Sequence, residues 1–540
     1  MSRGAGRTLW TAPAVLVAGL VVAPVAMLAV SIVRPNTAMW RHQWDTRLPG
    51  EIVDTLVLLA GVGIGSIVIG AGLAWLVSAY EFPGRRVLAW MLVLPLALPS
   101  YILGFLTVSM VGYTGPIQGT WRRVFGDDAW FPDVQSLWGA IIAFTLVLYP
   151  YVYLMTRAAL RDQAAGAYFA ARTLGATPLE AARRVVFPMV RPALAGGVVV
   201  VLMETLTDFA TIQYFDVNTV SVSVFRIWRG TYDRDAAAEI ATILLLFAVL
   251  AIVAERLARG RARFGVAGGR GAGFPVQALG RGRATAASGA CLAVLTAAFL
   301  APVAQLAWWA VGEQTGDRGT PMVGNVGEYV RHSMQLGGLT VIAAVIVAVV
   351  LANAQRFGFR RVATSANRLA TIGYAVPGPV LAIGVLLALV ALDNGLERLG
   401  ADLPGMVATG SLATLVYAYA VRFLAPALNS VDSGFAQIPD EMTDSARSLG
   451  AGPLRTAWAV HTPLAKASIA GAVVLVAVDA LKELPIVLLL RPFGFDTLPV
   501  WVYTLASESR YEQAALPSLA IIAVAFVPVV LLSRHLERER

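Results

Sequence analysis

The sequence contains FAARTLGATPLEAARRVVFPMVRP at residues 169–192 and DSARSLGAGPLRTAWAVHTPLAKA at residues 444–467. A constant offset of 275 residues aligns the two stretches and pairs Arg172 with Arg447, Gly175 with Gly450, Pro178 with Pro453 and Pro188 with Pro463. The chain is therefore predicted to be a tandem duplication.

Each copy is a polar hairpin between two long apolar segments. In the first copy Gly175 is expected to close one helix. Thr177, Pro178 and Glu180 follow at the N-cap, first and third positions of the next helix, which is a capping-box pattern. The pattern predicts a helix–turn–helix that projects from a membrane and suits docking to a soluble partner.

Pro188 and Pro192 should end the second helix of the first hairpin before the next apolar run begins.

The two copies are not expected to be equivalent. The second copy has Asp444 at its start, but Gly452 and Arg455 stand where the capping box would be.

Composition limits the class of protein. With 57% hydrophobic and 14% charged residues and a mean hydropathy of +0.69, the chain is too apolar for a soluble protein of its size. The charged residues behind its net charge of +9 fall in short loops rather than on one basic face. We therefore expect the lipid bilayer, and no nucleic acid, among its partners. Cys291 is the single cysteine, which excludes an intrachain disulfide or a thiolate cluster.

The apolar runs predict an all-α integral membrane protein with about 12 transmembrane helices, because roughly 20 residues cross the hydrocarbon layer. The expected spans lie near 9–33, 52–79, 87–110, 136–157, 193–215, 236–256, 286–311, 335–354, 369–392, 405–424, 468–490 and 514–533. The expected domains are a first six-helix unit at 1–256, a cytoplasmic Gly/Arg-rich linker at 257–285 and a second six-helix unit at 286–540. The linker is interpreted as flexible, with binding of anionic headgroups as the alternative.

Basic residues predict the orientation. Of the 42 lysines and arginines, 28 lie on the side that holds both termini and both hairpins. Short cytoplasmic loops carry this excess, so both termini and both hairpins are expected in the cytoplasm.

No ATPase can be built from this chain. A phosphate-binding P-loop needs Gly-Lys followed by Ser or Thr, and the only lysines, Lys466 and Lys482, follow Ala465 and Leu481. ATP hydrolysis must therefore come from partner subunits.

Enzymatic chemistry also lacks a constellation of residues. The histidines are isolated and no HExxH or GxSxG pattern accompanies them. We interpret each of the four histidines as a satisfied or solvated side chain: His42, His332, His461 and His535. We predict no catalytic, cofactor-binding or metal-binding residue in this chain.

Acidic residues recur in the span after each hairpin. Glu204 and Asp208 lie four residues apart, hence on one helix face, and the repeat places Asp479 and Glu483 at the same positions. An ionised side chain near the middle of a span costs about 2.5–3.5 kcal/mol, so these groups should face the protein interior or a water-filled cavity. They either line a central path or form buried hydrogen bonds and ion pairs, for which Lys482 is a local candidate.

Prolines interrupt the third span of each half, at Pro95 and Pro99 and at Pro377 and Pro379. Proline frees backbone carbonyls that lipid cannot satisfy, so these segments should be enclosed by other helices or border a cavity. A packed kink and a pathway-lining role both remain open.

Two outer segments, 111–135 and 491–513, mix aromatic residues with charge. Their aromatics are expected at the membrane interface. A docking surface for an external protein is the alternative.

The hairpin resembles the EAA loop of ABC-importer permeases, whose pattern is Glu-Ala-Ala, three residues, Gly, nine residues, Ile, one residue and Leu-Pro. Both copies keep this spacing, while Phe169 and Asp444 replace the leading Glu. The matching positions are Phe169, Ala170, Ala171, Gly175, Val185, Phe187 and Pro188, and then Asp444, Ser445, Ala446, Gly450, Val460, Thr462 and Pro463.

Nearly the whole chain resembles the fused, double-length permeases of the iron(III) type, a group similar to the thiamine, phosphonate and polyamine permeases. The segments 204–228 and 481–503 look most like the iron(III) members. The resemblance implies two tandem six-helix type I permease units in a bacterial cytoplasmic (inner) membrane. It also implies two ATP-binding cassette subunits on the cytoplasmic side and a substrate-binding protein outside.

Carried onto this chain, the resemblance implies the residues that couple to the ATPase, while the acids and prolines above supply the translocation-path candidates. The ATPase-coupling residues would be Leu174, Gly175, Ala176, Thr177, Pro178, Glu180, Leu449, Gly450, Ala451, Pro453 and Arg455. The translocation-path candidates are Glu204, Asp208, Asp479, Glu483, Pro99 and Pro377.

Other functions remain open from the sequence. A secondary transporter with a 6+6 repeat would explain the twelve spans and the acidic residues, but not the long hairpins. A polytopic membrane enzyme has no catalytic constellation in its support. The same permease role for thiamine, phosphonate or polyamine is a further alternative to iron.

Overall fold

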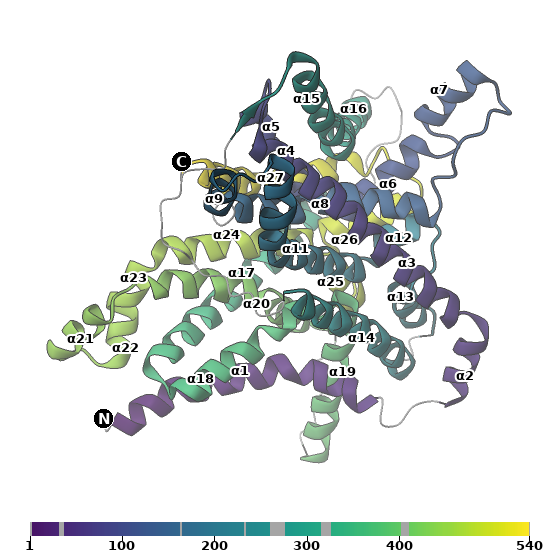
Figure 1. The fold of residues 1–540 in the computed structure, drawn as a ribbon. Helices are drawn as coiled ribbons and strands as arrows, with labels where there is room; N and C mark the ends of the chain where they lie inside the picture. The colour runs from purple at the N-terminus through teal and green to yellow at the C-terminus, as the bar shows by residue number, and fades with distance from the viewer. Residues whose placement is uncertain are drawn as a thin grey trace. The chain divides into compact units, whose positions relative to one another are not determined.

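The computed structural model describes residues 3–31, 37–161, 165–231, 234–259, 276–314, 326–400 and 410–538. These residues are almost entirely helical (Figure 1). The strands among them are β1 (Tyr80–Glu81) and β2 (Gln277–Ala278), a two-residue parallel pair in which Tyr80 faces Gln277. The predicted all-α class is confirmed.

Among the described residues, nine helices are long and apolar enough to cross a membrane, and two bent pairs raise that number to as many as eleven. The continuous candidates are formed by α1 (Arg3–Ser31), α3 (Leu48–Ser66) with α4 (Gly72–Ala79), α8 (Leu137–Ala159), α11 (Phe187–Thr207), α14 (Arg234–Arg259), α15 (Arg281–Leu295) with α16 (Ala301–Gln314), α17 (Val326–Phe357), α19 (Gly378–Arg398) and α20 (Leu412–Ala436). The predicted last span, 514–533, falls on α27 (Ala515–Arg538).

Shorter helices connect these spans or form parts of the broken spans. They are α2 (Thr37–Thr46), α5 (Arg85–Met91), α6 (Ser100–Val111), α7 (Pro116–Phe125), α9 (Ala165–Thr173), α10 (Pro178–Ala181), α12 (Phe209–Tyr214), α13 (Val220–Thr231), α18 (Arg360–Ala370), α21 (Asp440–Ser448), α22 (Pro453–Thr456), α23 (Thr462–Leu464), α24 (Lys466–Lys482), α25 (Pro485–Leu490) and α26 (Leu498–Ser507).

The fourth span of each half begins at a serine cap. The side chain of Ser136 accepts a hydrogen bond from the Gly139 N–H at the start of α8, and Ser411 accepts one from the Thr414 N–H at the start of α20. The predicted span 405–424 is therefore wrong in its bounds, since α20 begins at Leu412 and continues to Ala436. Arg422, which is one of the 28 basic residues predicted on the cytoplasmic side, is instead buried inside this span.

Four predicted spans are not continuous helices, including the span at 369–392, which breaks between Ala370 and Gly378. The span at 87–110 bends by 94° between Ala97 and Ser100. The span at 193–215 breaks after Thr207, where α11 ends, and the span at 468–490 breaks after Lys482, where α24 ends.

The chain forms two compact units, each made from both halves of the sequence. Unit 1 comprises residues 1–43, 223–245 and 323–501, and unit 2 comprises 44–222, 246–322 and 502–540. In unit 1, helices α17, α20 and α24 pack on one another, and α1 runs along α17, α18 and α19 (Figure 1). In unit 2, helices α3, α8 and α11 pack on one another, while α15 packs on α5 and α16 on α27.

The first span of each half thus packs with the central spans of the other half. The compact units therefore differ from the predicted division of the repeat at 257–285. That division stays a prediction about the sequence repeat, and its residues 260–275 lie outside the described residues.

Glycine permits a close contact between η1 (Ile67–Ala71) and α8 in unit 2. A Cβ added to Gly70 would lie 2.7 Å from the Tyr149 carbonyl oxygen and 3.0 Å from the Tyr153 nitrogen, both backbone atoms of α8. A Cβ on Gly72, two residues later, would meet nothing within 4 Å. Small residues allow membrane helices to approach at backbone distance, and of these two glycines Gly70 is the one at such a contact.

We expect Gly70→Ala to destabilise the detergent-solubilised protein by about 1–3 kcal/mol, because the methyl group forces α8 away. Gly72→Ala is the matched control and should be neutral or stabilising by up to about 1 kcal/mol. Thermal unfolding followed by near-UV circular dichroism checks both variants. Equal melting temperatures for the two variants would contradict this packing.

Candidate functional site

The first predicted hairpin closes as the sequence pattern indicates. Helix α9 ends at Thr173 and is followed by Gly175, whose φ of 89° lies in the left-handed region. The Gly175 N–H donates to the Arg172 carbonyl at 3.1 Å and the Ala176 N–H to the Ala171 carbonyl at 3.1 Å. These two bonds form a Schellman motif, which satisfies the last carbonyls of the helix.

The capping box after this turn is confirmed. The Thr177 N–H and hydroxyl both donate to Glu180 Oε2 at 2.9 Å, and the Glu180 N–H donates to Thr177 Oγ1 at 3.3 Å. The donated Thr177 N–H bond, with the hydroxyl second, lowers the pKa of the exposed Glu180 carboxyl. Glu180 is thus held in the ionised form that the cap requires.

The second hairpin repeats the turn without the box. Gly450 has a φ of 81° and donates to the Arg447 carbonyl at 2.9 Å, and the Ala451 N–H donates to the Ala446 carbonyl at 3.0 Å. Helix α22 then begins after Gly452, which provides no side-chain cap. The predicted asymmetry between the two hairpins is confirmed at this position.

Both turns present an exposed leucine. Leu174 and Leu449 directly precede the left-handed glycines, and each is 87% exposed. Each leucine therefore stands open to solvent at the tip of its hairpin. The other predicted coupling residues with described side chains are also exposed or half-buried: Gly175, Ala176, Thr177, Glu180, Gly450, Ala451, Pro453 and Arg455.

Pro188 and Pro192 do not end the helix that follows the first turn, so this expectation is wrong. A π-helical turn at Ala182–Val186 precedes α11, and the Phe187 N–H reaches back five residues to the Ala182 carbonyl. This pairing lets the chain pass Pro188, which has no N–H to offer, and Pro192 lies inside α11. In the second copy the same π-helical turn occurs at Ala457–His461, and there the chain bends by 76° after Leu464.

A buried polar cluster fastens the second hairpin to α17. His461 is fully buried, and its Nε2 lies 3.0 Å from Thr443 Oγ1 of α21 while its Nδ1 lies 3.2 Å from Asn353 Oδ1 of α17. The Phe357 ring of α17 stacks on the imidazole with centroids 5.2 Å apart. The first hairpin has Val186 at the position of His461 and cannot make this contact.

His461 is neutral at physiological pH. Burial, with the nearby positive charges of Arg356 and Arg447, lowers the pKa of His461 to about 4. Arg356 itself donates to the Phe435 carbonyl at 2.7 Å and so joins α17 to the end of α20.

We expect the second hairpin to be held equally firmly from pH 7 to 9 and to loosen as the pH falls from about 6.5 towards 4. In this interval an opened hairpin takes up a proton on His461 that the closed hairpin excludes. Hydrogen exchange of residues 440–465, corrected for the intrinsic pH dependence, measures the effect.

His461→Val should remove this pH dependence and weaken the hairpin by about 1–3 kcal/mol, since Thr443 and Asn353 lose a partner. Trp458→Ala, at an exposed position of the same turn, is the control. Unchanged protection in His461→Val would contradict the proposed anchor.

The helix break in unit 2 is capped by one of the predicted acids. Asp208 follows α11 and accepts a 2.9 Å hydrogen bond from the Thr211 N–H at the start of α12. Its carboxylate also accepts from the hydroxyls of Thr211 and Ser100. Ser100 is the first residue of α6, directly after Pro99, so one carboxylate joins the break in the third span to the break in the fifth.

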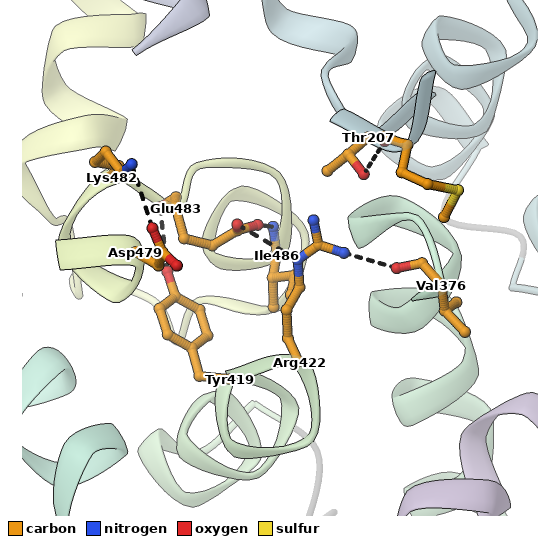
Figure 2. Close-up of polar contacts among 9 residues, drawn as sticks. Thr207, Val376, Tyr419, Arg422, Asp479, Lys482, Glu483 and Ile486 are labelled. Atoms are coloured by element: carbon orange, nitrogen blue, oxygen red, sulfur yellow. Dashed lines mark hydrogen bonds and ion pairs between the residues drawn. The ribbon is translucent and has the colours of Figure 1, made fainter. Parts of the chain in front are cut away.

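Unit 1 joins the corresponding breaks through an arginine, as Figure 2 shows. Glu483 Oε1 accepts from the Ile486 N–H at 3.1 Å, and Arg422 Nε lies 3.8 Å from Glu483 Oε2. Arg422 Nη1 donates to the Val376 carbonyl at 2.7 Å. Because Val376 directly precedes Pro377, Arg422 of α20 holds both breaks.

Two other predicted path residues lie one turn before these caps. Asp479 Oδ1 is 3.3 Å from Lys482 Nζ, which is the ion pair named in the second of the two alternatives for these acids (Figure 2). Glu204 is half-buried on α11. The acids of each pair do not share one continuous helix, since α11 ends at Thr207 and α24 at Lys482.

Three side chains of α8 that the sequence prediction missed complete the break near Pro95 and Pro99. Tyr149 Oη donates to the Leu92 carbonyl at 2.9 Å, and Tyr153 Oη donates to the Ala89 carbonyl at 2.7 Å. Arg157 Nη1 also donates to the Ala89 carbonyl, at 3.1 Å. The spacing of four residues places all three on one face of α8, and this periodicity beside a proline break is the signal that could have identified them.

We expect Arg422→Met to destabilise the protein by about 3–5 kcal/mol, because the Glu483 charge remains buried without its partner. The double variant Arg422→Met/Glu483→Gln should recover part of this loss, since the amide oxygen can still accept from the Ile486 N–H. A double-mutant cycle of chemical denaturation in detergent gives the coupling. Strict additivity of the two substitutions would contradict the bridging role.

Comparison with known proteins gives two matches to one family along the chain. Residues 66–263 and 340–539 each match the family described as "Binding-protein-dependent transport system inner membrane component". The chain is 23% identical over 496 residues to the Fe(3+)-transport system permease protein FbpB 2 of Haemophilus influenzae, covering 91% of this chain and 90% of that protein.

Shorter relatives match less than half of the chain. The sulfate transport system permease protein CysT of Salmonella typhimurium is 28% identical over 234 residues, 41% of this chain and 82% of that protein. The permease protein PhnU of Salmonella choleraesuis, whose name assigns it 2-aminoethylphosphonate, is 28% identical over 229 residues, 41% of this chain and 79% of that protein.

Proposed function

Because the chain belongs to the family of binding-protein-dependent transport system inner membrane components, and is thus an ABC-importer permease, we propose that it forms the translocation pathway for ferric iron. The observation that carries the coupling part is the pair of hairpins, each with a left-handed glycine and an 87% exposed leucine. One chain with two such hairpins would bind two ATPase subunits.

The coupling surface comprises the two turns, 174–180 and 449–455. Closure of the ATPase pair would move both hairpins and so switch the pathway between its two access states. The first hairpin runs directly into α11, whereas the second is fastened to α17 by His461. The two hairpins would therefore transmit movement through different helices of their units.

We choose iron as the proposed substrate because the relative named for Fe(3+) matches more of this chain than the other relatives described above. The relative named for Fe(3+) covers both halves of this chain, whereas those named for sulfate and 2-aminoethylphosphonate cover 41% of it. A binding protein outside the cytoplasmic membrane would deliver the cargo, and both termini would lie in the cytoplasm. The helix breaks at Pro99, Asp208, Pro377 and Glu483 would border the pathway, since interrupted helices at membrane depth are tolerated where protein or water encloses them.

We expect Leu174→Asp or Leu449→Asp to lower transport-coupled ATP hydrolysis at least about tenfold, equivalent to about 1.4 kcal/mol of lost coupling. Leu399→Asp is the control, because Leu399 is 84% exposed and precedes the left-handed Gly400, yet lies at the predicted outer end of α19. ATP hydrolysis in proteoliposomes containing the cognate ATPase and binding protein measures this. An equal loss in Leu399→Asp would contradict hairpin-specific coupling.

The substrate is tested in the same proteoliposomes by uptake of labelled ferric iron. Unlabelled ferric iron should abolish uptake, whereas sulfate, 2-aminoethylphosphonate, thiamine and polyamines should leave it within about twofold, a difference below 0.5 kcal/mol. Transport of one of these competitors would overturn the assignment to iron. Uptake driven by a proton or sodium gradient without ATP would instead favour a secondary transporter.

A further inference from the structure

Helix α7, in the outer segment of unit 2, has clear ends and no buried residue. It follows α6 through a turn in which the Gly115 N–H donates to the Gly112 carbonyl at 2.8 Å, and it begins at Pro116. It ends at Phe125, and the next residue, Gly126, has a φ of 96° and donates to the Arg122 carbonyl at 2.8 Å. No residue of α7 is buried, so its apolar side chains are open to contact with lipid or with another molecule.

The apolar side chains of α7 share one face. Ile117, Trp121, Val124 and Phe125 follow the helical spacing of four, seven and eight residues. Val124 is 68% and Phe125 60% exposed, and the Trp121 and Phe125 rings lie with centroids 4.2 Å apart. This is a continuous apolar stripe rather than a set of scattered surface residues.

Arginines occupy the other face. Arg122 lies 4.1 Å from the centroid of the Tyr113 ring and donates to the Tyr113 carbonyl at 2.7 Å. Arg123 is exposed beside it. An amphipathic helix with aromatic residues on one face and arginines on the other is typical of helices that lie in a membrane–water interface.

The exposed apolar surface continues onto the neighbouring span. Helix α6 packs on α8, and the end of α6 lies beside the start of α8, since a Cβ on Gly112 would be 3.9 Å from Val134 Cγ1. In the first turns of α8, Trp138 is 70% and Ile142 58% exposed. On a membrane span, exposed apolar side chains of this kind face lipid, and the turn that leads into α7 lies at this same end of α8.

We propose that α7 is an interfacial helix that lies in the outer headgroup region and places Ile117, Trp121, Val124 and Phe125 in lipid. The arginine face meets water and anionic headgroups. Because α7 is joined to α6 by the short turn at 112–115, this contact anchors the outer end of α6. The inner end of α6 is held at Ser100 by Asp208, so both ends of the helix are fixed.

The test is electron paramagnetic resonance of the full chain in nanodiscs containing phosphatidylglycerol. A spin label is attached to Val124→Cys on the apolar face or to Gly119→Cys on the opposite face, where an added Cβ meets nothing within 4 Å. The wild-type chain, with its buried Cys291, is the control for labelling specificity.

Relaxation by oxygen and by a water-soluble nickel chelate should place the label at position 124 about 5–10 Å into the interface and the label at position 119 in water. Equal exposure of both labels to the nickel chelate would overturn the proposal. Protection of position 124 from the chelate only after a substrate-binding protein is added would also overturn it, by assigning the apolar face to that protein.

Discussion

A membrane helix cannot be interrupted unless its unpaired backbone groups find other partners, because the hydrocarbon layer offers none. This constraint governs the central helices of both units. The third and fifth spans of each half are broken, and side chains within the same unit satisfy the exposed backbone groups. Asp208 and Glu483 therefore act as caps at the start of α12 and α25.

The two units meet the constraint with different chemistry. In unit 2 the residue after Pro99 is Ser100, whose hydroxyl reaches the Asp208 carboxylate directly. In unit 1 the residue after Pro377 is Gly378, which has no hydroxyl, and the longer Arg422 side chain spans from Glu483 to the Val376 carbonyl. The corresponding position in the first half is Val147, so the arginine occurs only where the serine is missing.

Local patterns in the sequence predicted the features that depend on short stretches of chain. The left-handed turns at Gly175 and Gly450 and the Thr177–Glu180 capping box belong to this class, because each is formed by residues within six positions of one another. The apolar runs likewise located most spans within a few residues.

Features that depend on distant residues were not predictable in the same way. Asp208 was expected on the same helix face as Glu204, but its contact with Ser100 across 108 residues favours a break. The basic character of Arg422 predicted a cytoplasmic position, whereas the structure places it inside α20, where it pairs with Glu483. The packing of α1 with α17, α18 and α19 requires knowledge of which helices meet, which periodicity does not contain.

The contacts of Asp208 and Glu483 at the helix breaks connect the helix that follows each hairpin to other helices of the same unit. Under the proposed coupling, movement at the first hairpin would pass along α11 to Asp208 and thus to α6. Movement at the second would pass along α24 to Glu483 and thus to α20 and α19. In this account the exposed turns receive force from outside the chain, while the capped breaks transmit it within each unit.

The most direct test of this account is the mass of the complex that the chain forms with its cognate ATPase, measured by native mass spectrometry in detergent. Two ATPase subunits should bind the wild-type chain, and only one should bind when Leu174 or Leu449 alone is changed to Asp. An unchanged mass in both variants, or a wild-type chain that transports without any ATPase, would contradict it.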